Sequence, residues 1–503
     1  MSEPEETTAA RKSSLDISSE AMLELSAEVT KMISDYFAEI SSLRVFPQTA
    51  AGDLTRAVGE EIPTEGESLE KLLGDCRAII SGSRQNGHPR FFGYVASPST
   101  PVAAFADLIA STINPNVTSW RSSPAATEIE RIIIRWLGSL VGYTEDAQGL
   151  LTSGGSMANL EALLIAQRMK AKSDLGTSGL WNSGPPMTVY ASSEVHMSIP
   201  KAADILGFGR DQVRIVDCDD RLRMDVRALC NLIQQDLRRG LRPFCIVASA
   251  GTVNTGAIDP LPEIAEVAGE FDLWFHIDGA YGAFGALDER KRARFQDLNR
   301  ADSLSLDPHK WLYVPVDCGC LLFRDPVAAR AAFSAGDVDY IKVHVDKQDE
   351  TFAFWDYGVE LSRRFRALKI WMTLRYYGLR RIREAISEDN SLTEYLSELI
   401  ERAEDFELLA PVELSICCFR YVPAKYEARD LSEADLNELN KRIMQAVQRG
   451  GSAYISNATI GGKFALRACI TNFRTKRSDI DETLEIIRDS GRRLWRGHGH
   501  GIP

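Results

Sequence analysis

Six short apolar segments follow one another between residues 187 and 323, and helical patterns separate several of them. Short, continuously apolar runs are typical of strands that other layers cover on both faces. Strands that alternate with helices predict an α/β fold, with a mostly parallel sheet and helices on both sides. The expected strands are residues 187–191, 213–216, 244–248, 273–277, 304–306 and 320–323, and the expected helices between them are 198–207, 225–240 and 262–271.

Polar side chains come directly after four of the expected strands. In an open α/β sheet, ligands bind at the carboxyl ends of the strands. Each side chain alone has an ordinary explanation, because an aspartate there often forms a turn or cap and a histidine there is often structural. Four groups at one edge of one sheet instead indicate a functional site. They are Glu194 and His196, Ser249 and Thr252, Asp278 and Ala280, and His309 and Lys310.

Lys310 is the leading candidate for a catalytic side chain. The expected strand 304–306 stops at Asp307 and Pro308, because proline lacks an N–H and pushes the preceding residue out of the helical region. The chain therefore turns and presents Lys310 at the end of a strand. A lysine that is partly shielded from water loses its proton more easily and can form a Schiff base. An ordinary surface lysine after a turn is the alternative.

A second signal lies upstream, where Thr152-Ser-Gly-Gly-Ser156 precedes the helical run 160–169. A turn of this composition at the start of a helix exposes unpaired N–H groups at the positive end of the helix dipole. Such a turn can bind a phosphate. The pattern is neither a Walker motif nor a dinucleotide fingerprint, and a simple helix cap would also use serine and glycine.

The composition restricts the classes of protein and of partner. The chain has 503 residues, 44% of them hydrophobic and 26% charged, which is typical of a soluble globular protein. A formal net charge of −13 without a long basic run argues against nucleic acid and anionic membranes as partners. Nine irregularly spaced cysteines include no CxxC pair, so we expect no metal site and reduced thiols in the cytoplasm. We expect neither a secretory leader nor a membrane-spanning segment.

The chain is expected to have three parts. Residues 1–85 contain two amphipathic helical patterns, at 18–43 and 68–80, and form an N-terminal helical arm. Residues 86–385 form a large α/β domain. Residues 386–503 combine strands and helices in a small α+β domain, with a hairpin near residue 461. Because the arm has little core of its own, we expect it to pack on the second subunit of a homodimer.

Several motifs together resemble one family. Thr152-Ser-Gly-Gly-Ser156, His196, the segment Ile-Asp-Gly-Ala at 277–280 and the segment Asp-Pro-His-Lys at 307–310 are similar to the group II pyridoxal phosphate-dependent decarboxylases, which are the aromatic-L-amino-acid decarboxylase family of fold type I. The similarity covers about residues 85–380 and includes 88–92, Trp120, Ser123-Pro124 and 361–369. It implies a large domain with a mostly parallel seven-stranded sheet that binds pyridoxal 5′-phosphate.

The resemblance implies a role for each residue of the expected site. Lys310 holds the cofactor as an internal aldimine. Asp278 keeps the pyridine nitrogen protonated, so that the ring accepts the electrons left on Cα after decarboxylation. His196 stacks over the ring and Ala280 packs against its other face. The remaining cofactor contacts are Thr252 near the ring substituents, Gly155 and Ser156 at the phosphate, and His309 beside the lysine on the phosphate side.

The resemblance also implies residues that act on the substrate. In this family a tyrosine of a mobile loop protonates the quinonoid carbon after CO₂ leaves, and Tyr340 is its match here. The substrate itself is expected to contact Tyr94, Trp120 and Ser362. Serine at position 362 accompanies phenolic rather than indolic substrates in some plant members. The expected reaction is therefore decarboxylation of an aromatic L-amino acid to its amine.

Two alternatives concern the substrate and the product. Residues 307–319 are also similar to a bacterial branch that includes decarboxylases of aliphatic amino acids, and the small Val95 side chain would reshape the pocket. Relatives with phenylalanine in place of the loop tyrosine tend toward aldehyde synthesis. Tyr340 therefore favours release of the amine.

Other functions would change the reaction itself. An aminotransferase on this fold would normally stack an aromatic residue where His196 is expected, and would use a small-domain arginine such as Arg467 for the substrate carboxylate. A cysteine desulfurase needs a cysteine on a flexible loop, whereas Cys318 and Cys320 lie in or beside an expected strand. A pyridoxal-binding regulator would need a DNA-binding module, and the acidic N-terminal arm offers none.

Overall fold

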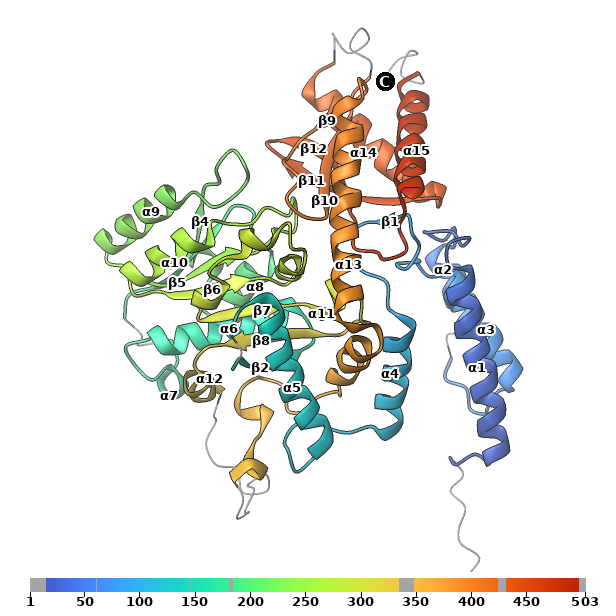
Figure 1. Ribbon diagram of the computed structural model, residues 1–503, viewed down its shortest axis with the longest axis horizontal. Helices are drawn as coiled ribbons and strands as arrows, with labels where there is room; N and C mark the ends of the chain where they lie inside the picture. Colours follow the sequence, from blue (N-terminus) through green and yellow to red (C-terminus); the bar gives the residue numbers. More distant parts are fainter. Residues whose placement is uncertain are drawn as a thin grey trace, which may run out of the picture. The chain divides into compact units, whose positions relative to one another are not determined.

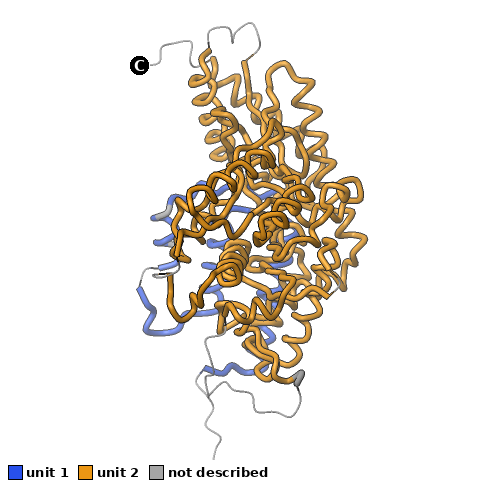
Figure 2. The backbone as a smooth tube through the Cα atoms, turned by 90° about the vertical axis from the view of Figure 1, so that its left-hand side faces the viewer, with its two compact units in different colours: residues 1–85 blue, residues 86–503 orange. Residues whose placement is uncertain are grey.

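Two compact units make up the chain, residues 1–85 and residues 86–503, and Figure 2 shows them in different colours. The structure is a computed structural model that describes residues 15–59, 61–144, 146–180, 184–333, 348–423 and 431–496. Within these described ranges, no helix combines the length and the apolar composition that a membrane span requires.

The first unit is helical. α1 (Ser19–Glu39) begins after Ser18, whose hydroxyl accepts a hydrogen bond from the N–H of Ala21. α1 and α3 (Leu69–Ser81) confirm the two helices that the sequence predicts here. The pattern does not predict α2 (Ala51–Val58), because this short helix lies in a stretch rich in glycine and proline. α1 contains no buried residue.

A seven-stranded sheet forms the centre of the second unit (Figure 1). Its strands are β2 (Gln148–Thr152), β3 (Met187–Ser192), β4 (Val213–Val216), β5 (Arg242–Ser249), β6 (Trp274–Asp278), β7 (Ser303–Leu306) and β8 (Gly319–Phe323). They lie in the order β2-β8-β7-β6-β5-β3-β4, and β8 runs antiparallel to its neighbours. The predicted mostly parallel sheet is therefore confirmed. The sequence pattern misses β2, because only Leu150 and Leu151 in it are apolar.

Helices cover both faces of this sheet (Figure 1). Connections between parallel strands are right-handed, so a helix lies on the face that the direction of its crossover dictates. α6 and α8 pack against each other on one face, and α9 and α10 pack on β5 on the other. The α-helices between residues 101 and 333 are α4 (Pro101–Ile113), α5 (Pro124–Val141), α6 (Gly155–Lys170), α7 (Leu175–Ser178), α8 (Ser198–Ile205), α9 (Val226–Arg238), α10 (Leu261–Glu270), α11 (Pro308–Trp311) and α12 (Pro326–Phe333).

A second sheet of five strands lies in the order β1-β11-β12-β10-β9. Its strands are β1 (Phe91–Phe92), β9 (Phe406–Leu408), β10 (Ile416–Tyr421), β11 (Tyr454–Ile460) and β12 (Lys463–Cys469), and the helices α14 (Glu433–Gly450) and α15 (Arg477–Arg496) accompany it. The predicted hairpin joins β11 to β12, and Gly461 and Gly462 both have positive φ there, which suits glycine. β1 comes from far upstream and pairs with β11 in parallel.

α13 (Ala367–Arg402) links the two sheets in the sequence and breaks at Gly378, whose φ is 75°. The proposed boundary at residue 385 falls inside this helix, so a division of residues 86–503 into a large and a small domain stays a prediction. Each sheet has a hydrophobic core of its own. Phe91 is buried and its ring stacks on Tyr454, with ring centroids 5.3 Å apart, and Phe92 belongs to the core of the second sheet.

Candidate functional site

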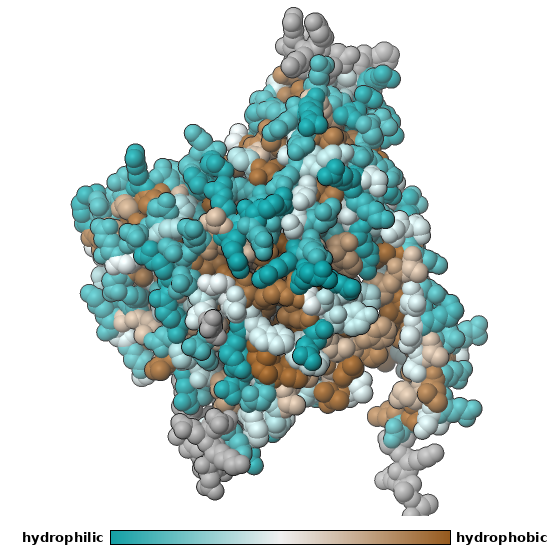
Figure 3. Space-filling model, viewed as in Figure 1, coloured by the Kyte–Doolittle hydropathy of each residue, from teal (hydrophilic) through white to brown (hydrophobic). Residues whose placement is uncertain are grey.

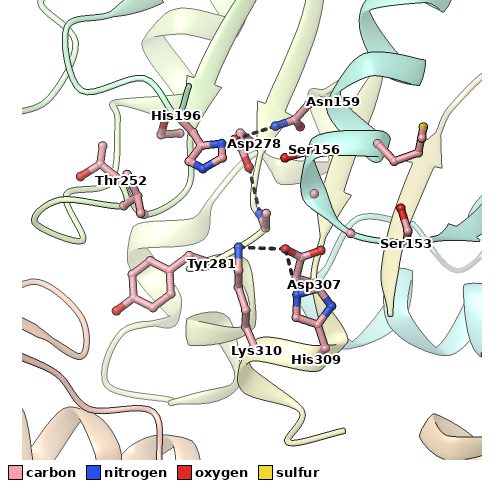
Figure 4. Close-up of a pocket in the computed structure, with 17 residues that line it drawn as sticks. Ser153, Ser156, Asn159, His196, Thr252, Asp278, Tyr281, Asp307, His309 and Lys310 are labelled. Carbon is pink, nitrogen blue, oxygen red and sulfur yellow. Dashed lines mark hydrogen bonds and ion pairs between the residues drawn. The ribbon is translucent and has the colours of Figure 1, made fainter. Parts of the chain in front are cut away.

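One pocket of about 350 Å³ lies at the carboxyl ends of the parallel strands (Figure 4). Its side chains come from the segments that follow β2, β3, β5, β6 and β7. The fold thus brings together groups that are spread from residue 155 to residue 310 in the sequence. All the residues predicted to contact the cofactor line it: Gly155, Ser156, His196, Thr252, Asp278, Ala280, His309 and Lys310.

Lys310 lies in α11, a single helical turn that begins with Pro308. Proline suits this position because the first N–H of a helix has no partner within the helix. The Lys310 ammonium lies 2.8 Å from Oδ2 of Asp307 (Figure 4). The other carboxyl oxygen, Oδ1, is buried and has no hydrogen-bond partner among the described residues. Lys310 is therefore a partly buried amine that is paired with a buried carboxylate.

The N-terminal end of α6 lines the same pocket as Lys310. The first N–H groups of a helix have no acceptor within it and attract anions. A side chain at Gly155 would place its Cβ only 2.7 Å from the Cβ of Ala280 and 3.0 Å from Oδ2 of Asp307. These distances are too short for any residue except glycine. Glycine therefore lets the helix start pack closely against Ala280 and Asp307 at the edge of the pocket.

Asp278 ends β6, and its carboxylate accepts three hydrogen bonds. Its Oδ1 accepts hydrogen bonds of 3.1 Å from the Ser305 hydroxyl and of 3.1 Å from the Ala280 N–H, and its Oδ2 accepts one of 2.9 Å from the Asn159 amide. Burial opposes ionisation, yet the pKa of Asp278 lies below its ordinary value because the neighbouring imidazoles and Lys310 stabilise the carboxylate. Asp278 is therefore charged at neutral pH.

His196 follows β3 and faces the same pocket (Figure 4). Its Nδ1 lies 2.8 Å from the Oγ of Ser198 and 3.2 Å from the backbone nitrogen of Ser198. Burial lowers the pKa of His196 below its ordinary value. The ring is therefore neutral at neutral pH. Thr252, on the loop after β5, is buried and its hydroxyl lies 3.0 Å from that of Thr255.

His309 and Tyr281 border Lys310 on two sides (Figure 4). The N–H of Cys318 donates a 3.1 Å hydrogen bond to Nδ1 of His309, which fixes the imidazole. The Tyr281 ring stacks on Trp311, with ring centroids 5.3 Å apart and an angle of 16° between the planes. Trp311 in turn donates to the buried Asp389 of α13. The turn that carries Lys310 is thus anchored on both sides.

The residues predicted to bind the substrate do not line this pocket of the single chain. Tyr94 is 52% exposed and its hydroxyl lies 3.1 Å from that of Tyr454. Trp120 is half-buried, and Ser362 is exposed. Tyr340 lies outside the described residues. Their contacts with a substrate stay predictions.

Arg467 lies on β12, and its guanidinium bonds to the protein itself. It donates to the carbonyls of Val253 at 2.6 Å, Asn254 at 3.0 Å and Tyr94 at 2.8 Å. A guanidinium has five N–H donors in a fixed fork, and four hydrogen bonds here, one of them to Ser456, involve all three nitrogens. Arg467 thus holds the loop after β5 and does not line the pocket.

The pocket also contains residues that the sequence pattern does not single out. Asn159 lies three residues after Ser156, and this spacing on a helix places both side chains on one face. Asp307 belongs to the lysine motif but appears only as a turn residue in the pattern. Tyr281 directly follows Ala280. Helical spacing could have indicated Asn159, whereas the contact between Asp307 and Lys310 depends on the tertiary fold.

A family model described as the pyridoxal-dependent decarboxylase conserved domain matches residues 51–422. The chain belongs to the pyridoxal-dependent decarboxylase family. The aromatic-L-amino-acid decarboxylase of Bacillus atrophaeus is 35% identical over 474 residues, which cover 94% of this chain and 95% of that protein. A phenylacetaldehyde synthase of Petunia hybrida is 28% identical over 467 residues, which cover 91% of this chain and 91% of that protein.

Among solved structures, Oryza sativa TDC with PLP and tryptamine matches with a TM-score of 0.88 and 28% identity, over 95% of this chain and 99% of that chain. The predicted decarboxylase family and the predicted fold type I are therefore confirmed. The pocket of this decarboxylase also fits pyridoxal phosphate. Lys310 supplies an amine for its aldehyde carbon, the open start of α6 suits its phosphate, and the charged Asp278 suits its pyridine nitrogen.

Proposed function

We propose that this decarboxylase converts an aromatic L-amino acid to the corresponding amine and CO₂, with pyridoxal phosphate as its cofactor. One observation carries the proposal: a lysine, a charged aspartate and a histidine meet in one pocket with an open helix start. These are Lys310, Asp278 and His196, with Gly155 at the helix start. The aromatic class is supported by the Bacillus atrophaeus relative and by Ser362.

When bound, the cofactor supplies a pyridine ring that accepts the electrons left on Cα as the carboxylate departs. Lys310 would hold the aldehyde carbon and give way to the substrate amine. Oδ2 of Asp307, 2.8 Å from the Lys310 nitrogen, would orient the lysine side chain in the pocket. Asp278 would keep a proton on the pyridine nitrogen by pairing with it.

The other pocket residues would orient the cofactor. The neutral His196 would lie on one face of the ring and Ala280 on the other. Ser156 and Gly155 would donate N–H groups to the phosphate, with His309 beside Lys310 on the phosphate side. Thr252, held by Thr255, would limit the movement of the ring at its edge.

The test is to incubate the purified, cofactor-loaded protein with a panel of L-amino acids and to follow CO₂, amine and hydrogen peroxide together. We expect equal amounts of CO₂ and amine from tyrosine, dopa, phenylalanine or tryptophan. Release of CO₂ only from valine, leucine or methionine would mean that the substrate is an aliphatic amino acid. No CO₂ from any of them, with the cofactor bound, would contradict the proposed reaction.

Aldehyde synthesis is a second candidate, because the Petunia hybrida relative is a phenylacetaldehyde synthase. This reaction would release CO₂, ammonia and an aldehyde, and would reduce dioxygen to hydrogen peroxide. The choice between the two products depends on whether Cα receives a proton before dioxygen reacts. Tyr340 would be the proton donor, so its presence favours the amine.

Replacing Tyr340 by phenylalanine is expected to lower amine release by roughly 10²- to 10⁴-fold, the usual contribution of a general acid. Aldehyde and hydrogen peroxide should replace the amine while CO₂ release continues. Chromatography of the products with a peroxide assay measures the change. Tyr376→Phe removes the hydroxyl of a tyrosine that is 68% exposed and should leave the products unchanged. If Tyr340→Phe still released only amine, the role of Tyr340 would be wrong.

The active unit is proposed to be a homodimer, with its sites completed by residues of the second subunit. The face drawn in Figure 3 has a hydrophobic area near its centre. Within the second unit, α4 exposes Leu108, Ile109 and Ile113 to between 46% and 60%. Exposed apolar side chains grouped on one helix are typical of an interaction surface. In the first unit, the amphipathic α1 buries none of its residues.

Leu108→Asp is expected to weaken the dimer and to lower activity together, because a charge on the apolar side of α4 opposes burial. Ile215→Asp is the control, since both side chains are 53% exposed and Ile215 lies on β4 at the edge of the sheet. Gel filtration with light scattering measures the mass of each variant. A fully active wild-type monomer would contradict the proposal.

A cytoplasmic location is part of the same proposal. All nine cysteines are free thiols in the structure, and six of them are buried. Free thiols are typical of the reducing cytoplasm, whereas secreted proteins commonly form disulfides.

A further inference from the structure

A network of buried hydrogen bonds centres on Asn159, on the helix that starts at the cofactor pocket. Its amide nitrogen lies 2.9 Å from Oδ2 of Asp278 and 2.9 Å from Oγ of Ser198. Its amide oxygen lies 3.0 Å from Nε2 of His276. Asn159, His276 and Ser198 are all at most 3% exposed, so water does not replace any of these contacts. The proposed function uses none of the three.

The charge of Asp278 fixes which way the amide of Asn159 points. A carboxylate can only accept hydrogen bonds, so the amide NH₂ must face it and the amide oxygen must face His276. His276 therefore carries its proton on Nε2 and donates it to Asn159. Hydrogen positions follow here from the donors and acceptors of the whole network.

The far side of His276 agrees with this direction. Its Nδ1 lies 2.9 Å from the hydroxyl of Ser303 and 3.2 Å from the carbonyl oxygen of the same residue, so the hydroxyl contact is the shorter of the two. That hydroxyl accepts a 2.9 Å hydrogen bond from the indole N–H of Trp274. Ser303 can thus donate to Nδ1, which then needs no proton. Burial lowers the pKa of His276 to about 4, so its imidazole is neutral at physiological pH. Every donor from Trp274 to Asn159 points toward the pocket.

The other branch of the network reaches His196. Because the Ser198 hydroxyl accepts from Asn159, its own proton is free to point at Nδ1 of His196, 2.8 Å away. The backbone N–H of Ser198 also donates to Nδ1, at 3.2 Å. With two donors on Nδ1, the single proton of the neutral ring must be on Nε2. Among the described residues Nε2 has no protein partner, and His196 lines the pocket.

We propose that Asn159, held by His276, is a positioning residue that sets two protonation states at once. It stabilises Asp278 as a carboxylate. Through Ser198, it also holds His196 as the neutral tautomer with its proton on Nε2. His196 thereby offers the pocket a donor and never an acceptor. The charged groups that face His196 are Asp278 on β6, Lys310 on α11 and Asp307 before α11. Because the network donates to Nδ1, a second proton on His196 is disfavoured.

Nitrogen NMR of protein labelled with ¹⁵N-histidine tests the proposal without turnover. The chain has seven histidines, so the signals of His196 and His276 can be assigned from one variant of each. We expect both rings in the cofactor-free protein to be neutral and protonated on Nε2 between pH 7 and pH 9. A wild-type His196 protonated on Nδ1 would overturn the proposal.

Ser198→Ala is the decisive variant, because it removes the hydroxyl that connects Asn159 to His196. His196 should then partly populate the Nδ1-protonated form and titrate at higher pH. Ser192→Ala is the matched control: Ser192 is also buried, at the end of β3, but its hydroxyl has no partner among the described residues. If both variants gave the same histidine signals as the wild type, the relay would not exist.

The loaded enzyme provides a second readout, which rests on the proposed function. Ser198→Ala should lower kcat at neutral pH by roughly 2- to 10-fold, the effect of one hydrogen bond. The acid limb of its pH–rate profile should also move to higher pH, whereas Ser192→Ala should change neither. An unchanged acid limb in Ser198→Ala would overturn the relay. Absence of turnover in the wild type, with the NMR result intact, would instead contradict the proposed function alone.

Discussion

Lys310→Ala is expected to abolish decarboxylation and to remove the visible absorption that a lysine-bound cofactor produces. The variant lacks the amine that would hold the aldehyde carbon, so the cofactor would stay only through its phosphate and ring contacts. Asp307 would also lose its 2.8 Å partner. Absorption spectra after dialysis and CO₂ release from tyrosine or phenylalanine measure both losses. Added methylamine should restore part of the turnover.

Lys170→Ala separates this loss from the general effect of removing a lysine. Lys170 resembles Lys310 in its surroundings: its side chain is 25% exposed, against 20% for Lys310, and it pairs with Asp272 at 2.7 Å. It lies at the end of α6, away from the pocket lining. The control should keep the absorption band and the activity. Normal absorption in Lys310→Ala would mean that a different amine holds the cofactor.

The strands of the large sheet could be predicted because strands that are covered on both faces consist mainly of apolar residues. β3 to β8 are short and rich in apolar residues, and the pattern finds each of them within a few residues. β2 carries only Leu150 and Leu151 before its polar turn, so its pairing with β8 had to come from the tertiary fold. α2 is likewise too short for helical periodicity to show.

The pocket could be predicted because parallel strands bring their carboxyl ends to one edge. Asp278 ends such a strand, and His196 and Lys310 each follow one within a few residues, so the order of strands in the sheet was not needed to group them. Residues that position other side chains without lining the pocket cannot be recognised in the sequence in this way. His276 looks like any buried strand residue, and only its contact in the folded structure connects it to Asn159.

Residues from loops gave the least secure predictions. Tyr94 and Ser362 lie outside the pocket of the single chain, so their contacts with a substrate stay predictions. Arg467 shows a different difficulty. Its charge suggested a contact with the substrate carboxylate, but its donors are used on the carbonyls of residues 94, 253 and 254. Sequence alone cannot tell a buried structural arginine from a binding one.

Asp278→Asn is expected to lower kcat by roughly 10²- to 10³-fold, the size of effect seen when one preorganised electrostatic contact is removed. The amide cannot keep a proton on the pyridine nitrogen, while Lys310 and the helix start would still bind the cofactor. Because the pKa of Asp278 lies below its ordinary value, the wild type should keep this contribution as the pH falls through the ordinary aspartate range and lose it only below. The pH profile of kcat measures this.

The single variant also disturbs the network, because two amide NH₂ groups would then compete where Asn159 now donates to Asp278 at 2.9 Å. An unsatisfied buried donor costs about 1–3 kcal/mol of stability. Asn159→Asp combined with Asp278→Asn exchanges donor and acceptor, so it should recover stability in thermal unfolding. It moves the charge one side chain away from the ring nitrogen and should not recover kcat. If the double variant recovered both stability and kcat, Asp278 would act only through hydrogen bonding. If it recovered neither stability nor kcat, the position of Asp278 in the fold would matter more than its charge.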